Sequence, residues 1–403
     1  MIVSGRTLLS VALLLLIAVQ ANAGRNLPDT IVLSPEVLYE NRQRVFELDP
    51  ALMPAFDKLI SEAELAVNAP AEAVVLKPGP GPGNDMHDYW SIAPYWWPNP
   101  KTPDGLPYVH RDGERNPEAD SDKYDRMRMH RMSRDALTLA LAWYLTGNEQ
   151  YAGKGTGLIW SWCIDSVTRT NPNMQHAQAR PENSEGQHSG IVETRDLIRV
   201  IDAARILEPS HSWSTVVTRK LTAWFSEYAK WLRHSDFGKQ EASSPNNHGT
   251  WFDAQLAVYA MYTGDTDFAR SMILTTYQRR IVRQINPDGS MPRELERTRP
   301  RHYTFFNLEA LFVLAAVAER LDIDLWHETD TKGPSIRKAF DFAAPYIDPK
   351  KPWPNGKTGA FNPFAFTPLF HRAAVVYKDG RYLEFMEALP ADKLKQDRAN
   401  LFY

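Results

Sequence analysis

The chain has 403 residues, of which 43% are hydrophobic and 24% charged, and its formal net charge is −3. A chain of this length can bury a large core, and its near-neutral charge lacks the basic excess typical of nucleic-acid-binding proteins, so no nucleic acid partner is expected. The only cysteine is Cys163, which excludes an intrachain disulfide framework and a cysteine-rich metal site.

Residues 1–23 have the pattern of a secretory signal peptide. Arg6 supplies the positive charge, an apolar stretch runs from Leu8 to Val19, and residues 21–23 (Ala-Asn-Ala) resemble a cleavage site. The apolar stretch is shorter than the roughly 20 residues that a membrane span needs. We therefore expect an exported protein, periplasmic or secreted, with no stable membrane insertion. Its mature part, residues 24–403, is expected to form a single domain.

Apolar residues recur at helical spacing along the mature chain. Leu137, Ala140, Leu141 and Tyr144 fall at positions i, i+3, i+4 and i+7, which predicts a helix. The same spacing or composition predicts further helices at 35–47, 51–67, 197–204, 212–234, 249–262, 265–284, 304–320 and 334–345. No run alternates with period two for long enough to predict a sheet. The expected class is all-α.

Two segments, 144–152 and 261–269, resemble each other. In each, an apolar helix ends at Thr-Gly and a second helix follows. The glycines suit a left-handed C-terminal cap, and the next residue can start the following helix. These pairs are Gly147 with Asn148 and Gly264 with Asp265. Repeated helix hairpins stack into a solenoid or close into a toroid, although two helix ends can also resemble each other by chance.

The proline-rich segment 77–121 cannot be helical throughout. Five large aromatic residues lie between positions 89 and 97, which argues against disorder. These rings either form a wall that stacks against sugar rings or attach the loop to the helices. The candidates for substrate contact in this loop are His87, Tyr89, Trp90, Tyr95 and Trp96.

Two polar loops, 168–190 and 235–248, are expected between helices. Asn247 and His248 would lie at a helix N-terminus, which favours a negative charge such as a substrate carboxylate, although an asparagine there can also be a simple cap. In the earlier loop, Gln187 and His188 are candidate substrate contacts.

The segment 293–303 carries four arginines, two glutamates, a histidine and a tyrosine. Such a run is usually a solvated set of paired charges. Here it abuts an aromatic stretch, and arginines beside Tyr303 would lower the pKa of its phenol from about 10 and make it a usable proton carrier. Arg297, Arg301 and His302 are the other candidates in this segment. No metal or phosphate-binding motif is present, so no metal or cofactor is expected.

Three motifs occur in order: His-Asp-Tyr-Trp with Tyr-Trp-Trp-Pro at 87–98, Asn-Asn-His-Gly-x-Trp at 246–251, and Arg…His-Tyr at 297–303. Together they resemble the alginate-lyase superfamily of polysaccharide lyases over about residues 85–325. The resemblance implies an α/α toroid and eliminative cleavage of a polyuronate without a required cofactor. By position, Asn247 and His248 match the family's catalytic Asn-His pair, Arg297 its arginine and Tyr303 its tyrosine.

The stretch from Arg297 to Tyr303 is one residue shorter than in the best-known mannuronate-specific branch of this superfamily. The aromatic loop at 87–98 resembles the corresponding loop of a more distant branch, which includes glucuronan lyases. The expected substrate is therefore an acidic polysaccharide, either poly-β-D-mannuronate (alginate) or β-1,4-glucuronan. In both polymers H5 and O4 lie on the same face, so one group can act as base and acid. We assign both roles to Tyr303, with His248 assisting or serving as an alternative base.

Two other functions are compatible with the sequence. An inverting glycoside hydrolase on a similar toroid would need a pair of essential carboxylates, which the chain's many acidic residues could supply. A non-catalytic glycan-binding protein would use the tryptophan loop to bind sugars and would release no product.

Overall fold

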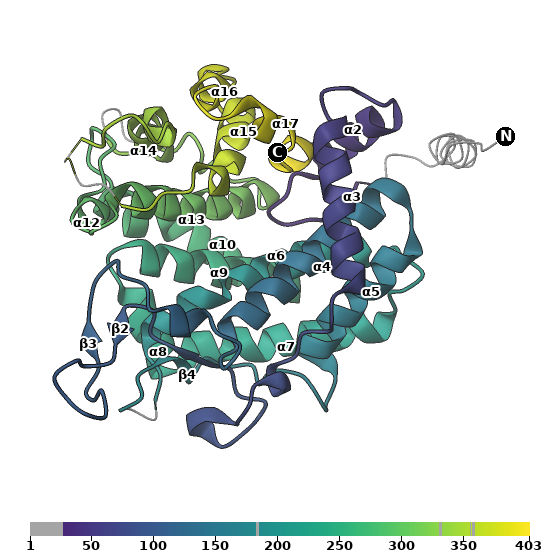
Figure 1. Ribbon diagram of the computed structural model, residues 1–403. Coiled ribbons are helices and arrows are strands. Elements are labelled where there is room, and N and C mark those ends of the chain that lie inside the picture. The colour runs from purple at the N-terminus through teal and green to yellow at the C-terminus, as the bar shows by residue number, and fades with distance from the viewer. Residues whose placement is uncertain (1–26, 183–184, 330–332, 355, 357–358) are drawn as a thin grey trace.

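The computed structural model describes residues 27–182, 185–329, 333–354, 356 and 359–403. The signal peptide predicted at 1–23 lies outside these residues. Most of the described chain is helical (Figure 1). The longer helices are α2 (Pro35–Phe46), α3 (Met53–Asn68), α4 (Arg126–Thr146), α5 (Glu149–Ile159), α6 (Leu197–Leu207), α7 (Thr215–His234), α8 (Asp236–Ser243), α9 (Asn247–Thr263), α10 (Thr266–Thr276), α13 (Pro300–Arg320), α14 (Ile336–Ala343) and α15 (Thr367–Val376).

Shorter helices complete the chain: α11 (Val282–Gln284), α12 (Pro292–Leu295), α16 (Arg381–Met386), α17 (Ala391–Lys395) and α18 (Ala399–Phe402). Two short sheets are also present, although the sequence predicted none. β1 (Trp90–Ile92) pairs in parallel with β4 (His176–Ala179), and β2 (Trp96–Trp97) pairs antiparallel with β3 (Val109–His110). Strands of two to four residues are too short to show period-two alternation.

The two resembling segments are helix hairpins, as predicted. Gly147 and Gly264 adopt left-handed conformations, with φ of 72° and 83°, and cap α4 and α9. Asn148 accepts a hydrogen bond from the backbone N–H of Gln150 and so caps α5. Asp265 stands at the start of α10 but makes no cap hydrogen bond, because its carboxylate pairs with Arg233 at 3.0 Å.

The core is built around α9 and α13. Fourteen of the 17 residues of α9 are buried, as expected of a helix with neighbours on all sides. It packs against α6, α7, α10 and α13, while α4 packs against α3, α5 and α6. α5 also packs against both α4 and α6. We call α4, α6, α9 and α13, each of which contacts the next in this order, the inner helices.

The two ends of the described chain meet (Figure 1). The C-terminal helix α18 packs on α2 and α3. The buried Asp202 of α6 accepts backbone N–H groups from Ile31 at 2.8 Å and Leu33 at 2.9 Å, which ties the N-terminal segment to the inner helices. Among the described residues no helix combines the length and apolar character required to cross a membrane.

The long loop 77–121 is anchored to this helical body. The buried Lys77 pairs with Asp125 at 3.2 Å. The predicted polar loop 235–248 is largely helical instead, because Ser235 caps α8 by accepting the N–H of Gly238. One side of the molecule, at the left of Figure 1, carries β2 and β3 of the long loop together with α8 and α12.

Candidate active site

The first turn of α9 presents Asn247 and His248. The side chain of Asn246 caps the helix by accepting the N–H of His248 at 3.2 Å. Gly249 is required next, because a Cβ there would lie 2.2 Å from the carbonyl oxygen of Ser244. Arg280 stabilises this close contact between Gly249 and Ser244 by donating hydrogen bonds to the Ser244 carbonyl and to the carboxylate of Asp253.

Asn247 is oriented by Glu294 of α12. The backbone N–H and the side-chain amide of Asn247 each donate to one carboxylate oxygen of Glu294, both at 2.7 Å. Both side chains are buried. Burial raises the pKa of Glu294, although the hydrogen bonds from Asn247 and the charge of Arg297 oppose this shift. The asparagine is therefore held by two hydrogen bonds rather than acting only as a helix cap.

His248 and His188 share one buried carboxylate, that of Glu241 in α8. The Nδ1 atom of His248 lies 2.6 Å from one oxygen of Glu241, and the Nδ1 atom of His188 lies 2.7 Å from the other. Burial alone would lower the pKa of His248, but the charge and hydrogen bond of Glu241 outweigh it, so this pKa is raised. The two histidines in turn lower the pKa of Glu241 against the effect of its own burial. The arrangement favours a protonated His248 whose Nε2 atom is available to a substrate.

The phenol of Tyr303, at the start of α13, contacts a second tyrosine and an arginine. Its hydroxyl lies 2.7 Å from that of Tyr95, and the guanidinium of Arg297 lies 3.8 Å from the centre of its ring. Arg297 is held by Asp112 of the long loop at 2.9 Å. The prediction of a lowered pKa for Tyr303 is wrong for this site. Burial and the neighbouring Tyr95 raise the pKa well above its usual value, and Arg297 only partly offsets them.

These groups form one electrostatic unit. The pKa of His248 depends on the charges of Glu294 and Arg297 as well as on Glu241, and the pKa of Arg297 depends on Tyr303. The structure thus brings together all four residues that the resemblance placed in the catalytic set. Within the described residues no group of three or more histidine, cysteine, aspartate or glutamate side chains has an arrangement that could hold a metal ion.

Several residues of the aromatic loop attach it to the helical body, which is the second of the two roles considered for them. Tyr89 is 1% exposed and donates its hydroxyl to the buried Glu193 at 2.8 Å, so its role is structural, contrary to the prediction. Trp90 packs edge-on against Tyr124, with ring centres 4.8 Å apart. The Nδ1 atom of His87 lies 2.6 Å from the carbonyl oxygen of Arg169 and joins two loops.

Trp96 and Gln187 keep part of their surface exposed, but each is engaged by the protein. The ring of Trp96 is covered by the guanidinium of Arg180 at 4.4 Å. Gln187 donates its amide to the carbonyl of Gln178 at 2.8 Å. Their predicted substrate contacts stay predictions.

Arg301 and His302 are also engaged by the protein. The guanidinium of Arg301 donates to the backbone carbonyl of Lys351 at 2.6 Å, which braces a neighbouring loop. His302 stacks on Phe306, and its burial lowers its pKa to about 4, so it is neutral. A charged contact from His302 to a substrate carboxylate is therefore not supported.

Three acidic residues of the site were not identified from the sequence: Asp112, Glu241 and Glu294. Glu294 lay inside the charged run, where it looked like a partner for a neighbouring arginine. Glu241 lay in a segment expected to be a loop. Charged side chains are rarely buried without a partner, but burial at these positions depends on contacts between distant segments.

The sequence profile of the family described as Alginate lyase matches residues 76–353. Among solved structures, an alginate lyase from Bacteroides ovatus is 32% identical with a TM-score of 0.86, and the match covers 93% of this chain and 99% of that chain. Alginate lyase A1-III from Sphingomonas species A1 is 16% identical with a TM-score of 0.54, over 94% and 99% of the two chains. A variant of A1-III complexed with a tetrasaccharide is 15% identical with a TM-score of 0.57, over 94% and 97%. No curated protein sequence gives a significant match.

The A1-III structures are too distant in sequence to establish more than the fold. They confirm the predicted α/α toroid. The family profile covers more than half of the chain, and the structure from Bacteroides ovatus matches almost all of it. The chain therefore belongs to the alginate lyase family of polysaccharide lyases.

Proposed function

We propose that this protein cleaves a β-1,4-linked polyuronate by β-elimination and leaves an unsaturated uronate at the new chain end. The observation that carries the proposal is the meeting of Asn247, His248, Arg297 and Tyr303 from separate elements in one charged cluster. The polymer is either the poly-β-D-mannuronate of alginate or β-1,4-glucuronan. Tetrasaccharide binding by an A1-III variant supports an oligosaccharide substrate.

Elimination requires negative charge on the uronate carboxylate to be stabilised while H5 is removed. In water this proton is too weakly acidic to leave, so donors that face the developing charge supply much of the catalysis. His248 is suited to this role because Glu241 raises its pKa and keeps it cationic. The amide of Asn247 and the guanidinium of Arg297 are the other donors.

Tyr303 then moves the proton. In the resting site its phenol is protonated because burial raises its pKa. Before the first turnover this proton leaves to solvent, and the resulting phenolate, to which Tyr303 returns after each cycle, is stabilised by Arg297 over the ring. The phenolate takes H5, the C4–O4 bond breaks as the C4–C5 double bond forms, and the phenol returns the proton to O4. H5 thus ends on the leaving oxygen, and each cycle consumes no net proton.

The test is a panel of alginate, poly-mannuronate, poly-guluronate and glucuronan, each followed by ultraviolet absorbance of the double bond and by product mass. We expect unsaturated products from at least one polymer with β-1,4-linked mannuronate or glucuronate. Tyr303→Phe should reduce the rate by about 10²- to 10⁴-fold, the usual contribution of a positioned acid–base group. Saturated products that persist in this variant would instead identify an inverting hydrolase, and binding without any product would identify a glycan-binding protein.

We also propose that the protein is exported, because residues 1–23 have the three parts of a secretory signal. Expression of the full chain in a bacterial host, followed by fractionation and N-terminal sequencing, tests this proposal. We expect the chain to be recovered from the periplasm or medium with Gly24 as its first residue. A cytoplasmic chain with an intact N-terminus would contradict it.

A further inference from the structure

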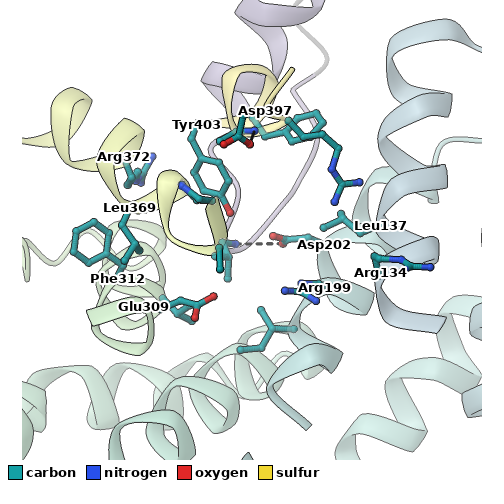
Figure 2. Close-up of a pocket in the computed structure, with 18 of the residues that line it drawn as sticks. Arg134, Leu137, Arg199, Asp202, Glu309, Phe312, Leu369, Arg372, Asp397 and Tyr403 are labelled. Atoms are coloured by element: carbon teal, nitrogen blue, oxygen red, sulfur yellow. Dashed lines mark hydrogen bonds between the residues drawn. The ribbon is translucent and has the colours of Figure 1, made fainter. Parts of the chain in front are cut away.

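A cavity of about 680 Å³ lies among the inner helices (Figure 2), and none of the four catalytic candidates lines it. Its walls come from α4, α6 and α13 and from the C-terminal segment. The volume is within the usual range for small-molecule sites. Trp251 in its wall lies 5.2 Å from Phe306, which stacks on His302, the neighbour of Tyr303, at 5.8 Å.

The lining of the cavity has an excess of positive charge. It contains seven lysines and arginines but four aspartates and glutamates. Arg195 is one of these cations. Its guanidinium donates to the carbonyl of Val192 at 3.2 Å and lies 5.1 Å from the ring centre of Phe306. No carboxylate in the described chain forms an ion pair with it, so it is available to an anion.

Several polar groups in this lining also lack partners within the described residues. Trp251 is 3% exposed, and its indole N–H has no hydrogen-bond acceptor. Within the described residues the carboxyl group of Glu309 makes no hydrogen bond or ion pair; its pKa is raised by burial and by the charge of Asp196, and is lowered in part by Arg195 and Arg199. Figure 2 shows Glu309 and the hydroxyl of Tyr403 pointing into the same space from opposite walls. A buried polar group without a partner, such as the indole N–H of Trp251, is uncommon and costly.

We propose that this cavity is a second binding site for an acidic sugar, either a single uronate unit or a short uronate oligomer, separate from the site of cleavage. A uronate combines one carboxylate, several hydroxyls and an apolar ring face. Arg195 and Arg199 can bind the carboxylate. The carboxylate of Glu309 can accept a hydrogen bond from one sugar hydroxyl, and the indole N–H of Trp251 can donate one to another. The choice of a uronate over other sugar acids rests on the proposed function.

Access to the cavity is favourable for such an anion. Lys58, Arg134 and Lys393 line the cavity and are exposed to solvent. Positive groups around an opening raise the local concentration of anionic ligands. The polymer cleaved at the active site would itself supply the short uronates that bind here, so the site would respond to the product of the reaction.

Two substitutions test this inference without altering a catalytic candidate. Ala365 lines the cavity but is exposed, so Ala365→Trp should fill the space without disturbing the core. Arg199→Gln removes one cation, which otherwise pairs with Asp196 at 3.1 Å. The mature protein and both variants would be titrated by calorimetry with D-glucuronate, with D-glucose as the neutral control and inorganic phosphate as a simple anion. Thermal unfolding would check that each variant is folded.

We expect D-glucuronate to occupy two classes of site in the parent protein. One class should weaken by about tenfold or more in both variants, as expected for loss of charged hydrogen bonds or of space. Initial cleavage of long polymer should be unchanged. Glucuronate binding that is the same in both folded variants would overturn the inference, and so would equally tight binding of glucose or phosphate at this site. If no polymer is cleaved, the proposed function fails, but the titration still decides whether the cavity binds a uronate.

Discussion

The hydroxyl pair of Tyr95 and Tyr303 yields a direct test of how the proton carrier is positioned. Tyr95→Phe removes one oxygen and leaves the ring in place. The hydroxyl of Tyr303, on a side chain only 6% exposed, then loses its one hydrogen-bond partner in the described chain, which lay 2.7 Å away. Leaving a buried hydroxyl without a hydrogen-bond partner raises the free energy of that state by about 1–3 kcal/mol. If that cost falls on the transition state, kcat should drop about 5- to 150-fold.

The same loop offers a matched control. Tyr89→Phe is chemically the same change six residues away, and it removes a hydrogen bond to Glu193 at 2.8 Å. Glu193 keeps the hydroxyl of Ser91 at 2.7 Å, so we expect a loss of about 1 kcal/mol in the free energy of unfolding. Its kcat should stay close to that of the parent protein.

The assay is the initial rate of double-bond formation at saturating polymer, together with urea unfolding of each variant. A Tyr95→Phe enzyme that keeps its full kcat would refute the positioning role of this hydroxyl. So would equal losses of kcat in both variants, because a general weakening of the loop would then explain the result.

Two further predictions concern charge. Arg297→Gln removes the cation that lowers the pKa of Tyr303, so the rising limb of the pH–kcat profile, which follows ionisation of Tyr303, should move to higher pH. Asp112→Asn should move this limb to lower pH, because Asp112 raises that pKa; shifts of the same sign would contradict this assignment. Glu241→Gln should lower the pKa of His248, as followed by NMR. Because the folded-state pKa of His248 is raised, the stability it contributes is present at mildly acidic pH and is lost as the pH rises through that pKa. Unfolding in urea should therefore show a loss of about 2 kcal/mol at about pH 5.5 and a smaller loss at about pH 8.5; equal losses would count against the ion pair.

Local patterns in the sequence determined much of the fold. Apolar spacing predicted the helices that became α4, α6 and α13, because a buried helix face must repeat with the period of the helix. Gly147 and Gly264 marked two helix ends, because a left-handed residue is easiest for glycine. The motifs at 246–251 and 297–303 identified the catalytic candidates, which the structure brings into one cluster.

Only the tertiary structure decided which partners these residues have. Tyr95 and Tyr303 are 208 positions apart, and Asp112 and Arg297 are 185 apart, so no spacing rule relates them. The raised pKa of Tyr303 shows the physical reason most clearly. The sequence places arginines beside this tyrosine, which favours a phenolate, but burial of the ring in the folded site has the larger effect. Adjacency along the chain determines which charges are near, whereas burial depends on the packing of distant segments, and burial sets how strongly those charges act.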